Sequence, residues 1–196
     1  LSVRYVEKKE KTLVGFRERN NPRFITEITH CSILNKKVDE QITELCRLID
    51  SLSNPRSIAQ IEVAAGDEEV ALIFRNLESL DKLDEDKLIE FSKKANFRIY
   101  LQPSGPDSVY LLYPHENQAF LTYSLPKEDL VFHFHPTDFT QVNASLNRDM
   151  VQLALNLMEI DKTDNVLDLF CGLGNFSLPM AKYAAHVTGI EGSHEM

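Results

Sequence analysis

The sequence predicts an α+β domain with a mostly antiparallel sheet over residues 1–135, followed over residues 136–196 by the beginning of an α/β domain. Two patterns predict this division. Short alternating runs of apolar and polar residues, broken by Pro, Gly and Asn, fill the first part together with two helical patterns. From Asn143 onward, a helical pattern, an apolar run, a glycine-rich turn and a second apolar run follow in the order of a doubly wound, Rossmann-like sheet.

The first fifty-five residues predict three strands and one helix. Alternating runs at 3–6, 13–16 and 24–28 are separated by polar breaks, which is typical of a three-stranded meander. Apolar residues then recur at helical spacing, and Ser53-Asn54-Pro55 ends the pattern. These helical positions are Val38, Ile42, Leu45, Leu48, Ile49 and Leu52.

Residues 58–135 predict a hairpin, a helix and four further strands. The runs 58–63 and 69–74 flank Gly66-Asp67, a dipeptide that favours a tight turn. Leu88, Ile89 and Phe91 support a helix over 84–95. The remaining strands are expected at 98–101, 109–113, 119–124 and 130–135.

The last sixty residues predict a helix and two parallel strands. Asn143 is a candidate N-cap for a helix whose apolar residues run from Leu146 to Met158. The run 165–170 is expected to be a buried parallel strand, and 187–190 the next one, with a helix between them.

Composition and chain ends bound the class of protein. Hydrophobic residues make up 43% and charged residues 26% of the 196 residues, which is ordinary for a globular protein. No apolar run reaches the roughly 20 residues that span a bilayer, and the start carries no signal-peptide pattern. We therefore expect a cytoplasmic protein without membrane contact, and we expect the intact protein to be a monomer. Because the chain lacks an initial Met and ends at Met196 inside a motif, we also expect it to be part of a longer protein.

Positive charge gathers near the N-terminus although the net charge is -9. Between Arg4 and Arg23, seven cations face three glutamates, a local excess of four positive charges. This segment is either a surface that faces RNA or a solvated basic hairpin, and the sequence leaves both interpretations open.

The turn from Asp168 to Ser177 indicates a nucleotide-like ligand. Gly172 and Gly174 let the backbone approach a ligand closely at the start of a helix. The third glycine of a dinucleotide fingerprint is replaced by Ser177, which disfavours NAD. Asp168 would repel a pyrophosphate but suits S-adenosylmethionine, which carries an ammonium and a sulfonium group.

Glu191 ends the second parallel strand, 17 residues after Gly174. An acidic side chain at this strand end can accept hydrogen bonds from both ribose hydroxyls of a nucleotide. Together with Asp168, it favours S-adenosylmethionine as the cofactor over the alternative of an unrelated α/β nucleotide-binding fold.

Three stretches of the chain resemble the RNA 5-methyluridine methyltransferase family. They are Phe139-Thr140-Gln141-Val142-Asn143, Asn147-Arg148, and the run from Asp168 to Phe176. The resemblance extends upstream through 111–124 and 14–18, and it points to the branch that carries an iron–sulfur cluster and acts on 23S ribosomal RNA.

The resemblance implies roles for individual residues. Gln141, Phe170, Asn175 and Glu191 would contact the cofactor, Gly172 and Gly174 would shape the loop, and Asp168 would lie beneath it. From the residues alone, Gln141 would be a surface amide and Phe170 a core aromatic.

The resemblance also implies the chemistry. A cysteine thiolate attacks C6 of a flipped-out uracil, the methyl group is transferred to C5, and a carboxylate removes the C5 proton. Both catalytic residues are expected beyond residue 196, so no catalytic residue is assigned here and the chain alone is expected to be inactive. Cys171 is interpreted as a small hydrophobic residue of the loop, not as the nucleophile.

The three cysteines do not predict a disulfide framework, because they are odd in number and form no CxxC pair. The segment 24–34 resembles the one that holds the family's fourth [4Fe–4S] ligand, so Cys31 is the candidate metal ligand, with three cysteines expected upstream. Otherwise Cys31 is an idle thiol. Cys46 is expected in the core, and no metal is assigned to His133 and His135.

The resemblance thus implies an enzyme that methylates C5 of a uridine in 23S ribosomal RNA with S-adenosylmethionine, and ribosomal RNA as its partner. The alternatives are the transfer RNA branch of the same family, which lacks the cluster, and a non-catalytic RNA-binding module with a degenerate nucleotide fold.

Overall fold

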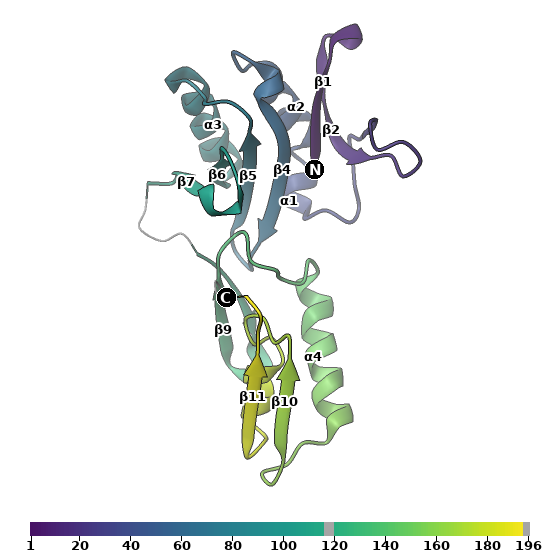
Figure 1. The fold of residues 1–196 in the computed structure, drawn as a ribbon, viewed down its shortest axis with the longest axis vertical. Helices are drawn as coiled ribbons and strands as arrows, with labels where there is room; N and C mark the ends of the chain where they lie inside the picture. Colours follow the sequence, from purple (N-terminus) through teal and green to yellow (C-terminus); the bar gives the residue numbers. More distant parts are fainter. Residues whose placement is uncertain (116–119, 194–196) are drawn as a thin grey trace. The chain divides into compact units, whose positions relative to one another are not determined.

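A computed structural model describes residues 1–115 and 120–193 (Figure 1). The chain has two compact units, Leu1–Ala119 and Phe120–Met196. The division lies earlier than residue 135, because the hairpin expected at the end of the first domain belongs to the second unit. Residue 119, where the first strand of that hairpin was expected to begin, lies outside the described residues.

The first unit is built on a mixed sheet that has seven strands among the described residues, in the order β3-β2-β1-β4-β5-β6-β7. All neighbouring strands are antiparallel except β5 and β6, which are parallel. The strands are β1 Ser2–Val6, β2 Lys11–Arg17, β3 Ile25–Glu27, β4 Ile58–Ala65, β5 Val70–Asn76, β6 Arg98–Gln102 and β7 Tyr110–Tyr113. The expected meander and the hairpin around Gly66-Asp67 are confirmed.

The helix expected after Cys31 is broken into α1 Lys36–Asp39 and α2 Ile42–Asp50. The break falls at Gln41, whose φ of -106° and ψ of 0° leave the helical region. Val38 in α1 and Ile42, Leu45 and Ile49 in α2 are nevertheless all buried. The apolar spacing therefore gave the buried face correctly and the continuity of the helix wrongly.

Helix α3 spans Lys82–Ala95 and begins two residues before the expected position. Asp81 is its N-cap, since its side chain accepts a hydrogen bond of 2.8 Å from the Asp84 N–H. The core of this unit joins buried residues of α2 and α3 to the sheet, among them Leu45, Ile49, Leu88, Phe91, Ile61, Phe74 and Ile99.

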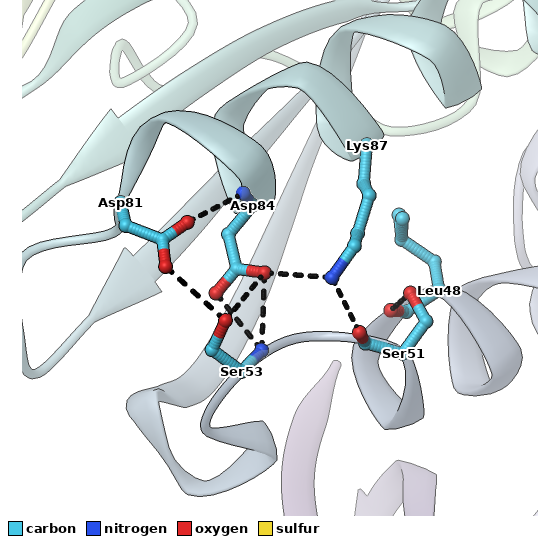
Figure 2. A network of polar contacts seen from close by, with 6 residues as sticks. All are labelled: Leu48, Ser51, Ser53, Asp81, Asp84 and Lys87. Atoms are coloured by element: carbon cyan, nitrogen blue, oxygen red, sulfur yellow. Dashed lines mark hydrogen bonds and ion pairs between the residues drawn. The ribbon is translucent and has the colours of Figure 1, made fainter.

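A polar network ties the end of α2 to the start of α3 (Figure 2). The carboxylate of Asp84 accepts hydrogen bonds of 3.0 Å from the Ser53 N–H and 2.9 Å from the Lys87 ammonium. Lys87 also donates to the Ser51 carbonyl at 2.6 Å, and the Ser53 hydroxyl donates to Asp81 at 3.2 Å. Asp84 is only 3% exposed, so this network fixes two helix ends around a buried charge.

The second unit contains a hairpin, a long helix and a β-α-β segment. The hairpin strands are β8 Leu121–Leu125 and β9 Leu130–Phe134, and the helix is α4 Ala144–Met158. The β-α-β segment consists of β10 Asn165–Leu169, α5 Ser177–Ala181 and β11 His186–Ile190, with the two strands parallel as expected. Asn143 is confirmed as the N-cap of α4, accepting from the Leu146 N–H at 3.0 Å.

Burial in the second unit differs from the expected pattern. Within α4, the residues classed as buried are Asn147 and Val151, whereas Leu146, Leu153 and Leu157 are exposed. The strand β10 was expected to be buried, but Leu167 and Leu169 are 58% and 56% exposed. Val166 and Asp168 are half-buried, so the described residues cover one face of β10 more than the other. No helix in the described ranges is long and apolar enough to cross a membrane.

Candidate functional site

The loop after β10 takes a backbone path that requires left-handed residues. Gly172 and Gly174 have φ values of 53° and 87°, a region that glycine enters without a steric penalty. Phe170 takes the same region with a φ of 62°, although it carries a bulky side chain. Left-handed non-glycine residues of this kind cluster at ligand-binding sites, and Phe170 is also 87% exposed. The interpretation of Phe170 as a core aromatic is therefore wrong.

Backbone contacts hold this loop against the end of β11. The N–H groups of Phe170 and Cys171 both donate to the Ile190 carbonyl, at 2.7 and 3.1 Å. A Cβ atom at Gly189 would lie 2.8 Å from the sulfur of Cys171, so only glycine leaves room for that thiol. Cys171 thus packs against the neighbouring strand, as expected for a small hydrophobic residue of the loop.

Glu191 lies directly against the glycine turn. One carboxylate oxygen accepts a hydrogen bond of 2.9 Å from the Gly172 N–H, and the other accepts one of 2.9 Å from the Ser193 N–H. Hydrogen bonds from Ser193 and Gly172 keep the pKa of Glu191 below its ordinary value, so the group is ionised at neutral pH. A carboxylate has about four acceptor positions, so acceptor positions remain for a ligand hydroxyl.

Asp168 links the end of β10 to the start of α5. Its Oδ2 atom accepts a hydrogen bond of 2.6 Å from the hydroxyl of Ser177, the first residue of α5. Its other oxygen makes no hydrogen bond to a described residue. The structure therefore brings Asp168, the glycine turn and Glu191 to one edge of the two-stranded sheet.

Asn175 is held by two residues for which the sequence analysis predicts no role. Its amide forms a reciprocal pair with the amide of Asn147, with both hydrogen bonds at 2.9 Å. The Tyr123 hydroxyl also donates to the Asn175 oxygen at 3.2 Å, and burial raises the pKa of Tyr123 to about 12. The amide of Asn175 therefore anchors the loop to α4 and to the β8–β9 hairpin.

Gln141 lies apart from these contacts. It is exposed in the segment between β9 and α4, and its side chain makes no hydrogen bond to any described residue. The structure therefore does not join it to the glycine turn, and its contact with a cofactor stays a prediction.

Cys31 lies in the loop before α1. Its backbone N–H donates to Asp39, whose other carboxylate oxygen lies 2.5 Å from Nδ1 of His30. The hydrogen bond from the Cys31 N–H lowers the pKa of Asp39, and the hydrogen bond with His30 lowers it further by a smaller amount. All three cysteines are free, and the part of the chain that the structure describes contains no group of three or more His, Cys, Asp or Glu residues that could hold a metal. The described residues alone thus do not form an iron–sulfur site.

The chain has the fold of a known methyltransferase. The crystal structure of the tRNA (uracil-54, C5)-methyltransferase of Pyrococcus abyssi, in complex with S-adenosyl-L-homocysteine, aligns with a TM-score of 0.68 at 20% identity. The alignment covers 100% of this chain and 49% of that chain. This fold, with a glycine turn between two acidic strand ends, defines a class of α/β proteins.

Within this class, the chain belongs to the tRNA (Uracil-5-)-methyltransferase family, whose sequence model matches residues 57–195. The resemblance found in the sequence is thereby confirmed at the level of the family.

Two curated relatives carry the name 23S rRNA (uracil(1939)-C(5))-methyltransferase RlmD. The one from Legionella pneumophila (strain Lens) is 59% identical over 196 residues, and the one from Hahella chejuensis (strain KCTC 2396) is 50% identical over 196 residues. Each alignment covers 100% of this chain and 44% of the relative. The chain therefore spans less than half the length of these relatives.

Proposed function

We propose that this protein transfers a methyl group from S-adenosylmethionine to C5 of a uridine in 23S ribosomal RNA. The observation that carries the proposal is the hydrogen bond between the Glu191 carboxylate and the Gly172 N–H, which joins the acidic end of β11 to the glycine turn. The relatives at 59% and 50% identity are named for 23S ribosomal RNA, which supports this branch over the transfer RNA branch.

The proposed cofactor site uses residues of the second unit. Glu191 would accept hydrogen bonds from the ribose hydroxyls, and the exposed Phe170, whose N–H donates to the carbonyl of Ile190 next to Glu191, would also contact the cofactor. The left-handed Gly172 and Gly174 would let the backbone come close to the ligand. Asp168 would lie beneath the loop, and Asn175 and Gln141 would contact the cofactor.

We infer that the described residues position the cofactor and that the nucleophile lies elsewhere in the full-length protein. Cys171 is packed against Gly189, which agrees with a nucleophile and a base placed elsewhere in the full-length protein. When bound, S-adenosylmethionine would supply the methyl group, and the loop from Phe170 to Asn175 would hold it in position.

Replacing Glu191 by alanine is the test of this function. We expect S-adenosylmethionine to bind about tenfold more weakly or worse, because a charged acceptor of two hydroxyl groups is lost. Isothermal titration calorimetry measures the affinity. The matched control is Asp149→Ala, which removes an exposed carboxylate from α4 and should leave affinity unchanged. Equal affinity of wild type and Glu191→Ala would rule out the assignment.

We further propose that Cys31 is one of four cysteine ligands of a [4Fe–4S] cluster in the full-length protein. The support is the resemblance of its segment to that of the family, since the described residues form no such site. After anaerobic purification of the full-length protein, Cys31→Ser should contain much less iron than wild type. Cys46→Ser, at a half-buried thiol, is the control and should keep its iron. Iron that persists in Cys31→Ser would contradict the proposal.

A further inference from the structure

Ser177 stands where a dinucleotide-binding turn carries its third glycine, and its hydroxyl is engaged at the base of the loop. The hydroxyl donates a hydrogen bond of 2.6 Å to Oδ2 of Asp168, nine residues earlier in the chain. Ser177 is the first residue of α5 and is 9% exposed, and Asp168 is half-buried near the end of β10. The bond therefore joins the strand before the glycine turn to the helix after it.

The neighbouring strand leaves the space that this hydroxyl occupies. In a dinucleotide-binding turn, the third glycine permits close packing of the helix against the strand. Here the glycine lies in the next strand instead, since Gly189 of β11 pairs with Asp168. A Cβ atom at Gly189 would lie 3.3 Å from the hydroxyl oxygen of Ser177, which is closer than most Cβ contacts in proteins. The hydroxyl is thus packed against β11 while it donates to Asp168.

The bond between Asp168 and Ser177 closes the base of the loop that carries the proposed cofactor contacts. Phe170, Gly172 and Asn175 all lie between the two bonded residues in the chain. A bond across the base of a loop removes conformations that the loop would otherwise lose when it binds a ligand, and this preorganisation raises affinity. The bond therefore restricts the loop before the cofactor binds.

The same bond fixes the direction of the Asp168 carboxylate. Oδ2 accepts from Ser177, and Oδ1 makes no hydrogen bond to a described residue. A carboxylate held at one oxygen presents the other in a fixed direction, where it can accept from an N–H group or an ammonium. Without the Ser177 hydroxyl, no side-chain hydrogen bond among the described residues would hold this carboxylate.

We propose that Ser177 is a positioning residue of the cofactor site, which acts on S-adenosylmethionine through the carboxylate of Asp168. This inference rests on the proposed function, because it takes S-adenosylmethionine as the ligand. The hydroxyl holds the carboxylate and the base of the loop in the arrangement to which the cofactor binds. Loss of the hydroxyl therefore weakens binding through Asp168, and loss of the carboxylate makes the hydroxyl irrelevant to affinity.

Isothermal titration calorimetry of S-adenosylmethionine on the full-length protein tests the proposal. Ser177→Ala should bind about tenfold more weakly than wild type, because a hydrogen bond to a charged group is lost. Ser177→Thr keeps a hydroxyl on the same carbon and should restore the affinity to within about threefold of wild type. The matched control is Ser145→Ala, which removes the hydroxyl of an exposed serine in the first turn of α4 and should leave the affinity unchanged.

A double-mutant cycle separates action through Asp168 from a purely structural role. Asp168→Ala removes the acceptor, so adding Ser177→Ala to it should cost no further affinity. Hydrogen exchange of the cofactor-free protein gives a second measurement, in which the amides of Gly172 and Gly174 should exchange faster in Ser177→Ala than in Ser177→Thr. Additive losses in the cycle, or a Ser177→Thr variant that binds as weakly as Ser177→Ala, would overturn the proposal.

The outcomes also separate this inference from the proposed function. If Glu191→Ala loses affinity while Ser177→Ala binds as wild type does, the cofactor site stands and the role of Ser177 is wrong. If wild type itself does not bind S-adenosylmethionine, the proposed function fails and the role of Ser177 fails with it. Far-ultraviolet circular dichroism that matches wild type shows that the variants compared are folded.

Discussion

Replacement of Asp84 by alanine is expected to lower the free energy of unfolding of the first unit by about 3 kcal/mol. The Asp84 side chain is 4% exposed, and it accepts from the backbone and hydroxyl of Ser53 and from Lys87. Alanine would leave the Ser53 N–H without this acceptor and the Lys87 ammonium without its carboxylate (Figure 2). The penalty is large because the groups that remain are partly buried.

Hydrogen exchange measures this effect in each unit separately. Amides of α2 and α3 should lose protection in Asp84→Ala, while those of β10 and β11 should keep theirs. The control is Asp86→Ala, since Asp86 is 56% exposed and pairs with Lys82 at 2.7 Å on the helix surface. Such a pair contributes about 0.5 kcal/mol or less. If the two variants lose equal protection, the network does not stabilise the helix ends as argued.

Elements with local signals could be predicted from the sequence. Gly66-Asp67 marks a turn within a few residues, and Asn143 caps α4 through a hydrogen bond to Leu146 three residues later. Both signals act within one turn of chain, so they need no knowledge of the tertiary fold. The parallel strand pair on either side of the glycine turn could also be predicted, because the strand, turn, helix and second strand follow one another directly in the sequence.

Features that depend on distant partners were missed. Asp84 was placed at the start of a helix, whereas its role comes from Ser53, 31 residues earlier. The parallel pairing of β5 with β6 was also not predicted, although a strand, a 14-residue helix and a strand follow one another there. That order is the usual signal of a parallel crossover and could have indicated it.

The candidate site was predictable in part. The position of Glu191 at the end of the second predicted strand indicated that it lies near the glycine turn, because the carboxyl ends of adjacent parallel strands meet at one edge of the sheet. Burial of Asn147 was not predicted, because the apolar pattern of α4 predicts Leu146 and Leu153 as buried residues, whereas both are exposed. The buried positions Asn147 and Val151 are four residues apart, so a polar residue at a core position was the available signal.

Replacement of Asn147 by leucine is expected to lower the free energy of unfolding of the second unit by about 2 to 4 kcal/mol and to weaken cofactor binding. Asn147 is 5% exposed, and it makes both of its hydrogen bonds to Asn175. Leucine would leave the Asn175 amide nitrogen without a partner in a half-buried position, whereas its oxygen would keep Tyr123. The loop that begins at Phe170 would then lose its anchor to α4. Asn156→Leu, at an exposed position of the same helix, is the control and should change stability by about 0.5 kcal/mol or less.

A double-mutant cycle decides whether the amide pair carries this effect. In Asn147→Leu/Asn175→Leu both partners are apolar, so no amide is left unpaired and the double variant should be more stable than the sum of the single losses predicts. We expect a coupling free energy of about 1 to 2 kcal/mol, measured by hydrogen exchange at the amides of β10 and β11. Tyr123→Phe should couple more weakly to Asn175→Leu, because its hydrogen bond is 3.2 Å long and reaches one atom of the amide. Additive losses in the Asn147 cycle would show that the two side chains stabilise the unit independently, and the anchoring of the glycine turn through Asn175 would then be wrong.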